Sequence, residues 1–288
     1  MPYFLSFESF AGCNLRCAEC PMGNMQIQRN AKELPFSIFK KVIDETHHFL
    51  CCAMLYFQGE PFLSKNIFEM IRYANEKKIY TIISTNAQLI DKEKTKKIIE
   101  SGLNKIIISI DGVDQSTYEK YRKGGNLQKA IDSIRYIKEE RKKSKTPLIE
   151  VQFIVFRHNE HQIKEIKKQG IEWGADVVSI KTAQIYDFNK KEELIPKNKK
   201  FSRYIKIENE WLLKKKQNNR CFRIFGGAVI AADGNVLPCC YDKSSTHTMG
   251  NVFNENFKNI WQGEQFTEFR KLVFYNRKQF EICKNCNE

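Results

Sequence analysis

The chain has 288 residues, of which 28% are charged and 42% hydrophobic, and its formal net charge is +14. This length is enough for one large domain or for a large and a small one. No apolar run approaches the roughly 20 residues that cross a bilayer, and the N-terminus lacks the basic and apolar segments of a signal peptide. We therefore expect a cytoplasmic protein with no membrane partner, in which most of the ten cysteines fall in two metal-like groups and do not form disulfides.

The excess of positive charge has two interpretations. One is affinity for nucleic acid, an anionic surface or an acidic partner. The other is a solvated lysine-rich surface, which we favour because the lysines are spread over most of the predicted helices and no basic segment is interleaved with aromatic residues. We therefore expect no nucleic-acid partner.

Apolar runs alternate with amphipathic segments along the first 180 residues. The runs predict buried strands at residues 3–7, 53–57, 80–84, 105–110, 149–156 and 175–180. Helical spacing predicts helices that open at Leu34-Pro35-Phe36 and that cover residues 66–77, 91–102, 127–143 and 160–173. Strands that alternate with helices pair in parallel, and right-handed crossovers wind such units into a curved sheet. We therefore predict an α/β fold, a partial (β/α)6 TIM-like barrel over residues 1–182, with its chemistry at the carboxyl ends of the strands.

The composition changes after residue 182. Charged residues become more frequent in residues 183–220, which we interpret as a connecting segment with one helix over residues 201–216. Residues 221–288 contain further cysteines and predict a second, smaller domain. In that domain, Ala232-Asp233-Gly234-Asn235-Val236 predicts a hairpin turn between apolar runs.

Three cysteines stand close together directly after the first predicted strand, in the pattern Cys13-x3-Cys17-x2-Cys20. Thiolates so close in sequence can turn onto one metal centre. A structural zinc site usually has four closed ligands, whereas three cysteines with no fourth nearby suggest an iron–sulfur cube with one open iron. A zinc knuckle and three unrelated thiols are the alternatives.

This cysteine pattern resembles the signature of the radical S-adenosylmethionine (SAM) enzymes, whose fold is also a partial barrel. The resemblance implies a [4Fe–4S] cluster whose fourth iron chelates the amino and carboxylate groups of SAM. It further implies that the reduced cluster cleaves SAM to a 5′-deoxyadenosyl radical, which abstracts a hydrogen atom from the substrate. An electron donor such as flavodoxin or ferredoxin would then be a partner.

Two motifs after the second and third predicted strands resemble SAM-binding motifs of that family. Gln58-Gly59-Glu60-Pro61 is similar to the family's Gly-Gly-Glu motif, with Gln58 in place of the first glycine. Gly59 allows a close approach of the backbone, and the Glu60 carboxylate could accept a hydrogen bond from the ammonium group of SAM. Thr85-Asn86-Ala87 is similar to the family's Thr-Asn-Gly, and Asn86 either lines the site or caps the turn.

Further candidates for SAM binding follow along the chain. Ser109-Ile110-Asp111-Gly112 resembles the Ser-x-Asp-Gly of relatives with a cysteine-rich extension, where the Ser and Asp face the ribose or carboxylate of SAM. Ser109 and Asp111 would point the same way from a strand; an Asx turn is the alternative. Arg122 either pairs with a carboxylate or lies on a solvated face. Gln152, within the fifth predicted strand, either points into the barrel at SAM or substrate or is a satisfied core amide.

The smaller domain contains four cysteines that could hold a second metal centre: Cys221, Cys239, Cys283 and Cys286. Its Asp-Gly-x-Val-x-Pro-Cys run and its closing Cys-x2-Cys resemble the shortened SPASM extension known as a twitch subdomain. The resemblance implies that these four cysteines hold one auxiliary [4Fe–4S] cluster with no open iron. A zinc ribbon with the same thiolates is the alternative.

Three residues are candidates for a catalytic role. Sulfatase-maturing relatives have an aspartate base at the position of Cys240, so that activity is disfavoured. Cys240 is either a hydrogen-atom donor or acid/base group near the substrate, or a spare thiol or alternative metal ligand. Arg157 and Lys181 follow or end predicted strands, where they either hold a polar substrate or lie on the surface.

These patterns together predict a radical SAM oxidoreductase or maturase-type enzyme. With an auxiliary cluster as electron acceptor, it would dehydrogenate or epimerise a small molecule such as a sugar or aminocyclitol. Because the first strand starts near residue 3, no N-terminal peptide-binding domain fits, which favours a small molecule over a peptide. A peptide-modifying maturase is the alternative within this class, and a non-catalytic zinc or RNA-binding protein is the alternative outside it.

Overall fold

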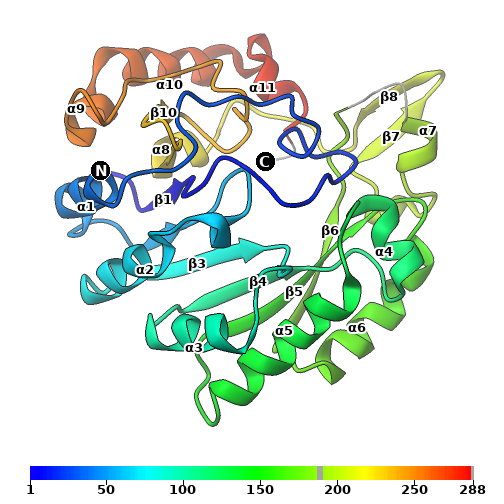
Figure 1. The fold of residues 1–288 in the computed structure, drawn as a ribbon. Coiled ribbons are helices and arrows are strands. Elements are labelled where there is room, and N and C mark those ends of the chain that lie inside the picture. Colours follow the sequence, from blue (N-terminus) through cyan, green and yellow to red (C-terminus); the bar gives the residue numbers. More distant parts are fainter. Residues whose placement is uncertain (187–190, 287–288) are drawn as a thin grey trace.

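A computed structural model describes residues 1–186 and 191–286, and its main feature is one eight-stranded sheet (Figure 1). The strand order is β10-β9-β1-β2-β3-β4-β5-β6. The first six strands are β1 (Phe4–Phe7), β2 (Cys52–Met54), β3 (Tyr80–Thr85), β4 (Lys105–Ser109), β5 (Leu148–Val155) and β6 (Val177–Thr182). Each pairs in parallel with the next along the chain. The predicted parallel α/β fold is therefore confirmed, and β6 and β10 are left as the two edges of an open barrel.

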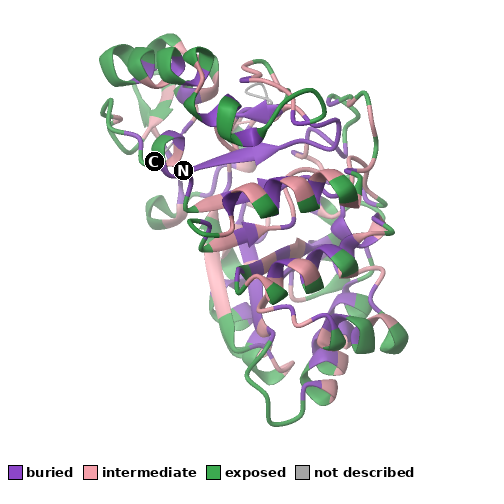
Figure 2. Cartoon of the chain, turned by 90° about the vertical axis from the view of Figure 1, so that its left-hand side faces the viewer, coloured by how far each residue is buried: buried purple, intermediate pink, exposed green. Residues whose placement is uncertain are grey.

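Helices cover the outer face of this sheet, and Figure 2 shows that they are buried on the side facing the strands and exposed on the other. They are α1 (Phe36–Thr46), α2 (Ile67–Glu76), α3 (Lys92–Glu100), α5 (Leu127–Glu140) and α6 (Ile163–Glu172), and each was predicted. Polar side chains fix where two of them begin, because Asp91 and Asn126 accept hydrogen bonds from backbone N–H groups of α3 and α5. The short helix α4 (Gln115–Tyr121) was not predicted. Among the described residues, no helix is both long enough and apolar enough to cross a bilayer.

The predicted helix over residues 201–216 is wrong. The structure has a two-stranded antiparallel hairpin there, β7 (Tyr204–Ile207) and β8 (Glu210–Leu213), preceded by the short helix α7 (Lys191–Leu194). Ile205 and Ile207 alternate with a lysine, which is the period of a strand, and β-branched and aromatic residues favour strands. The Glu208-Asn209 pair forms the turn, with Glu208 at a φ of +53°. The high charge of the segment masked this alternation.

The C-terminal residues extend the barrel's own sheet. Strand β9 (Gly227–Ile230) pairs in parallel with β1, and β10 (Val236–Leu237) pairs with β9 in antiparallel fashion. The predicted hairpin turn is confirmed, since the Ala231 N–H donates to the Asn235 carbonyl at 2.9 Å. The helices here are α8 (Arg223–Gly226), α9 (Phe257–Gln262), α10 (Glu264–Asn276) and α11 (Glu281–Lys284).

A buried ion pair joins the N-terminal and C-terminal parts of the chain. Glu8, which follows β1, lies 2.8 Å from Arg29 through its Oε2 atom, and both side chains are almost fully buried. The same Oε2 atom accepts a hydrogen bond from the Ala232 N–H at 3.1 Å. The Arg29 guanidinium also donates to the Lys243 carbonyl at 2.8 Å. One ion pair therefore holds three segments together: the end of β1, the region after the cysteine loop, and the C-terminal hairpin.

Candidate active site

Cys13, Cys17 and Cys20 lie in the loop that follows β1. This loop is held on one side by residues 121–123, because the Arg16 and Ala18 N–H groups donate to carbonyls of that segment at 3.1 and 3.0 Å. On the other side, the Glu60 N–H donates to the Gly12 carbonyl at 2.8 Å. The backbone therefore places the three thiols at the carboxyl edge of the sheet, where the sequence predicts the chemistry.

Gly59 is the close-contact point between this loop and the end of β2. Its φ is +81°, and an added Cβ would lie 2.3 Å from the Phe10 carbonyl oxygen and 2.7 Å from the Gly12 carbonyl oxygen. No side chain fits there, so the glycine lets the cysteine loop pass against β2.

Gly59→Ala is therefore expected to displace the cysteine loop. The positive φ and the clash with backbone together should lower the free energy of unfolding by about 2–5 kcal/mol, and the reconstituted protein should bind less iron. Gly124→Ala is the matched control, because Gly124 has a φ of +80° but its added Cβ would meet only the Leu15 side chain at 4.0 Å. The control should lose about 1–2 kcal/mol and no iron. Equal effects in chemical denaturation and iron assays would show that the close approach at Gly59 is unimportant.

Glu60 is buried and already bonded by three donors. Its Oε1 accepts from the Thr85 hydroxyl at 2.7 Å and from the Phe62 N–H at 3.2 Å, and its Oε2 accepts from the Asn86 N–H at 2.9 Å. Burial raises the pKa of this carboxyl group. A carboxylate has about four acceptor positions, so one acceptor position on Oε2 is left for a further donor. The predicted contact with the ammonium group of SAM stays a prediction.

Asn86 caps its turn and also contacts the cysteine loop. Its Oδ1 accepts from the Gln88 N–H at 3.0 Å. Its Nδ2 donates to Asn14 Oδ1 at 2.9 Å and to Cys13 Sγ at 3.6 Å. Asn86 therefore caps its turn, and its predicted place in the lining of the SAM site stays a prediction.

Asp111 and Arg122 form a buried ion pair beside the cysteine loop. Arg122 Nε lies 2.6 Å from Asp111 Oδ2, and its Nη1 lies 3.8 Å from Cys17 Sγ. The other Asp111 oxygen accepts from the backbone N–H of Ile154 on β5 at 2.6 Å. The solvated-face alternative for Arg122 is therefore wrong. Ser109 is buried at the end of β4, opposite Gln152, and a contact of Ser109 or Asp111 with SAM stays a prediction.

The four C-terminal cysteines line one small cavity. Its lining includes Cys221, Cys239, Cys283 and Cys286. Buried Arg277 lies in the same wall and donates from Nη2 to Cys286 Sγ at 2.9 Å. Within residues 1–186 and 191–286, no three His, Cys, Asp or Glu side chains are arranged around a single metal ion. A four-iron cube binds each cysteine through a different iron, so its ligands surround a volume and do not meet at one point.

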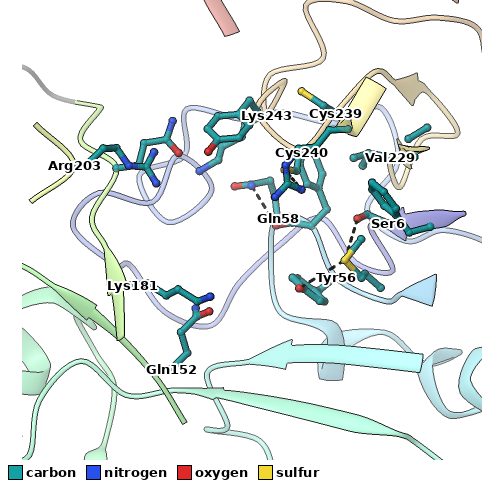
Figure 3. Close-up of a pocket in the computed structure, with 18 residues that line it drawn as sticks. Ser6, Tyr56, Gln58, Gln152, Lys181, Arg203, Val229, Cys239, Cys240 and Lys243 are labelled. Atoms are coloured by element: carbon teal, nitrogen blue, oxygen red, sulfur yellow. Dashed lines mark hydrogen bonds between the residues drawn. The ribbon is translucent and has the colours of Figure 1, made fainter. Parts of the chain in front are cut away.

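A larger cavity of about 420 Å³ lies inside the open barrel, and Figure 3 shows the side chains around it. Gln152 of β5 and Lys181 of β6 line one wall, and Cys239 and Cys240 line another. The structure therefore brings together three of the predicted site residues with a predicted cluster ligand. Arg157 does not line this cavity, because its Nε donates to the Ile195 carbonyl at 2.9 Å and fixes a neighbouring segment.

Comparison with known families decides the identity. The sequence model described as the radical SAM superfamily matches residues 7–180, more than half of the chain. The chain belongs to the radical SAM superfamily. A second model, SPASM, described as an iron–sulfur cluster-binding domain, matches residues 221–287. This radical SAM enzyme binds SAM at a [4Fe–4S] cluster and has an auxiliary cluster, as the sequence predicts.

Its relatives include enzymes with different reactions. The chain is 24% identical to the tungsten-containing aldehyde ferredoxin oxidoreductase cofactor-modifying protein of Pyrococcus furiosus, over 99% of this chain and 87% of that protein. It is also 24% identical to the PqqA peptide cyclase of Bradyrhizobium diazoefficiens, over 99% and 79% of the two chains.

Two solved structures show the same fold. SuiB of Streptococcus suis bound to S-adenosylmethionine has a TM-score of 0.72 at 18% identity, covering 100% of this chain and 72% of that one. BtrN in complex with AdoMet and 2-DOIA has a TM-score of 0.60 at 22% identity, covering 100% and 94%. At these identities the likeness concerns the fold alone.

The side chains of this radical SAM enzyme fit both cofactors. Asn86 and Arg122 aim N–H donors at Cys13 and Cys17, and hydrogen bonds to the sulfurs are a known determinant of cluster potential. The four C-terminal thiols around one cavity suit the auxiliary cluster, and a non-catalytic zinc or RNA-binding protein is set aside because the family is one of enzymes.

Several cavity residues were missed from the sequence. Arg203 lies in the segment predicted as a connecting helix, and Arg223, Tyr241 and Lys243 lie near the C-terminal cysteines. Nothing in their spacing marks them. Only their closeness in sequence to Cys221, for Arg223, and to Cys239, for Tyr241 and Lys243, could have drawn attention to the last three.

Proposed function

We propose that this radical SAM enzyme removes two electrons and two protons from a small molecule. The observation that supports it is the cavity of about 420 Å³, which extends from the barrel strands to Cys239, a predicted ligand of the auxiliary cluster. When bound, SAM and its cluster would supply a 5′-deoxyadenosyl radical that takes one hydrogen atom from a substrate C–H bond, and the auxiliary cluster would take the electron released as the substrate radical loses a proton. A flavodoxin or ferredoxin is the proposed electron donor.

The chain's own residues hold and shield this chemistry. Gly59, Asn86 and Arg122 fix the cysteine loop at the carboxyl ends of the strands. Apolar and aromatic side chains, including those of Met54, Tyr56 and Phe57, form part of the cavity wall. Such walls exclude water, which protects a reactive radical from side reactions.

A small molecule is favoured over a peptide by the size of the cavity. Its volume lies in the range of about 300–1,000 Å³ that is typical of small-molecule sites. The PqqA peptide cyclase and SuiB, which has been solved bound to its precursor peptide SuiA, keep peptide modification as the alternative. The test is release of 5′-deoxyadenosine by the reduced, reconstituted enzyme with candidate substrates of each kind. If only peptides stimulated release, the small-molecule proposal would be overturned.

Epimerisation is the second candidate, because the Cys240 thiol lines the same cavity. A hydrogen atom returned from this S–H to the substrate radical would give an epimer and leave a thiyl radical. One electron from the reductant and one proton would then restore the thiol. The guanidinium of Arg223, with Nη1 3.7 Å from Cys240 Sγ, helps to fix the sulfur.

Cys240→Ala in D2O separates the two reactions. If Cys240 returns the hydrogen atom, the epimer made by the wild-type enzyme carries one deuterium, because the thiol exchanges its proton with solvent. The variant should then form the epimer about 100-fold or more slowly while still releasing 5′-deoxyadenosine. If the enzyme is a dehydrogenase, mass spectrometry finds a product two hydrogens lighter, without deuterium at that carbon, in both proteins. Cys52→Ala, a half-buried cysteine outside the cavity lining, is the control.

A further inference from the structure

We infer that the substrate carries a carboxylate or phosphate group, which Arg203, Lys243 and Lys181 hold in the cavity between the barrel and the C-terminal cysteines. The inference rests on the proposed function, because it concerns the same cavity. It narrows the substrate to an anionic small molecule.

Apart from Cys239, a predicted ligand of the auxiliary cluster, the charged side chains that line the cavity are all positive. They are those of Lys181, Arg203, Arg223 and Lys243, and no Asp or Glu of the described chain lines the cavity. Figure 3 shows Lys181 beside Gln152, Lys243 beside Cys240 and Arg203 at the far left, so that the cations come from three separate segments. A solvated lysine-rich surface does not explain cations that converge on one cavity.

Three of these cations, Lys181, Arg203 and Lys243, form no close ion pair with a carboxylate within the part of the chain that the structure describes, although Lys181 interacts electrostatically with Glu150 at longer range. The Nε of Arg203 is buried and makes no hydrogen bond, and its Nη1 has a single carbonyl acceptor, that of Asn285, at 3.3 Å. A half-buried guanidinium without a counter-ion raises the free energy of the folded protein, because the charge has lost part of its hydration. An anionic ligand bound beside it offsets that increase.

Arg203 and Lys243 lie close to each other. The Lys243 ammonium group lies 4.3 Å from the centre of the Tyr186 ring, and Arg203 interacts electrostatically with both Lys243 and Tyr186. Two like charges held together repel each other unless an anion lies between them. The planar fork of an arginine matches the two oxygens of a carboxylate or phosphate.

The negative charge of the clusters does not account for all of these cations. Three other arginines already reach sulfur atoms: Arg122 at Cys17, Arg277 at Cys286 and Arg223 at Cys240. Lys243 interacts electrostatically with Cys20 and Cys240, so it serves the sulfurs as well as the cavity. Among the described residues, no hydrogen bond joins Arg203 or Lys181 to a sulfur atom, so variants of these two residues test the inference most directly.

The positive lining also favours one of the two small-molecule classes predicted from the sequence, a sugar, over the other, an aminocyclitol. An aminocyclitol would bring an ammonium group into a cavity that already holds like charges. A sugar acid or a sugar phosphate would instead complete the charge balance, with Gln152 and Gln184 available for its hydroxyl groups. We therefore favour an acidic or phosphorylated sugar-like substrate.

The test uses the full chain, reconstituted without oxygen and saturated with SAM. Glutarate is compared with glutaramide, and glycerol 3-phosphate with glycerol, by isothermal titration calorimetry. We expect at least one anion to bind about tenfold or more tightly than its neutral counterpart. Glutarate alone would indicate a carboxylate and glycerol 3-phosphate alone a phosphate. Equal or absent binding of all four probes would overturn the inference.

Variants then tie any binding to this cavity. Arg203→Gln and Lys181→Gln should each weaken the preferred anion about tenfold or more, whereas Lys206→Gln should not, because Lys206 is exposed on β7 and paired with Glu192. Lys181 is exposed, so its variant is expected to fold even if Arg203→Gln does not. Anion binding unchanged in both variants would refute the inference.

SAM cleavage measured on the same wild-type sample separates the two proposals. Cleavage without anion binding refutes only the inference, and anion binding without cleavage refutes the proposed function.

Discussion

Replacement of Cys13, Cys17 and Cys20 together by alanine is expected to abolish SAM cleavage while about half of the iron stays bound. The three thiols stand in one loop, and Gly59, Asn86 and Arg122 hold that loop from three sides. The other four cysteines line a separate cavity beside Arg277. Two four-iron clusters therefore predict a fall from about eight irons per chain to about four. Iron analysis and 5′-deoxyadenosine release measure the two effects.

A double variant, Cys51→Ala with Cys52→Ala, is the matched control. These two cysteines lie at the start of β2, one exposed and one half-buried, and belong to neither cysteine group. The control should keep all of its iron and its SAM cleavage. SAM cleavage that survived in the triple variant would remove the assigned ligand set, and loss of all iron would show that the auxiliary cluster depends on the first.

Arg29→Met is expected to lower the free energy of unfolding by about 3–5 kcal/mol, because it leaves the buried Glu8 carboxylate without its counter-ion. Both side chains of this pair are almost fully buried, and they are separated by 2.8 Å. Burial already raises the pKa of Glu8. Methionine has a volume similar to that of arginine, so the fall in the free energy of unfolding would come from the lost charge and not from a cavity. Denaturant unfolding of the reconstituted protein gives the value.

The control for Arg29→Met is Lys97→Met. Lys97 pairs with Glu93 at 2.7 Å on an exposed turn of α3, and such surface pairs contribute only about 0–1 kcal/mol. A small effect at both positions would mean that the Glu8–Arg29 pair does not hold the three segments together. A large effect at Arg29 should be accompanied by faster loss of iron from both clusters.

The sequence predicts the barrel well because its signals are local. Each predicted strand is a short apolar run, and each predicted helix has its apolar residues on one face, as with Ile131, Ile134 and Ile137 of α5. The cysteine groups are also recognisable by spacing alone. Residues 204–213 were mistaken for a helix because their lysines and glutamates hide the alternation of Ile205 and Ile207.

Other features depend on contacts between distant residues and leave no local pattern. The pairing of β9 with β1 joins residues more than two hundred positions apart. Arg203, Lys243 and Lys181 meet in one cavity although they come from the β7–β8 hairpin, the segment after Cys240 and β6. Arg122 was a candidate to pair with a carboxylate, but the sequence did not show that this carboxylate is Asp111 or that Arg122 also reaches Cys17.

The position of β1 in the sheet bears on how the protein is made. This strand is synthesised before one of its two neighbours, β9, which is formed by residues 227–230. Until those residues are synthesised, β1 has an unpaired edge, and such edges invite association with other chains. The completion of the sheet is therefore a late event in the life of the nascent chain.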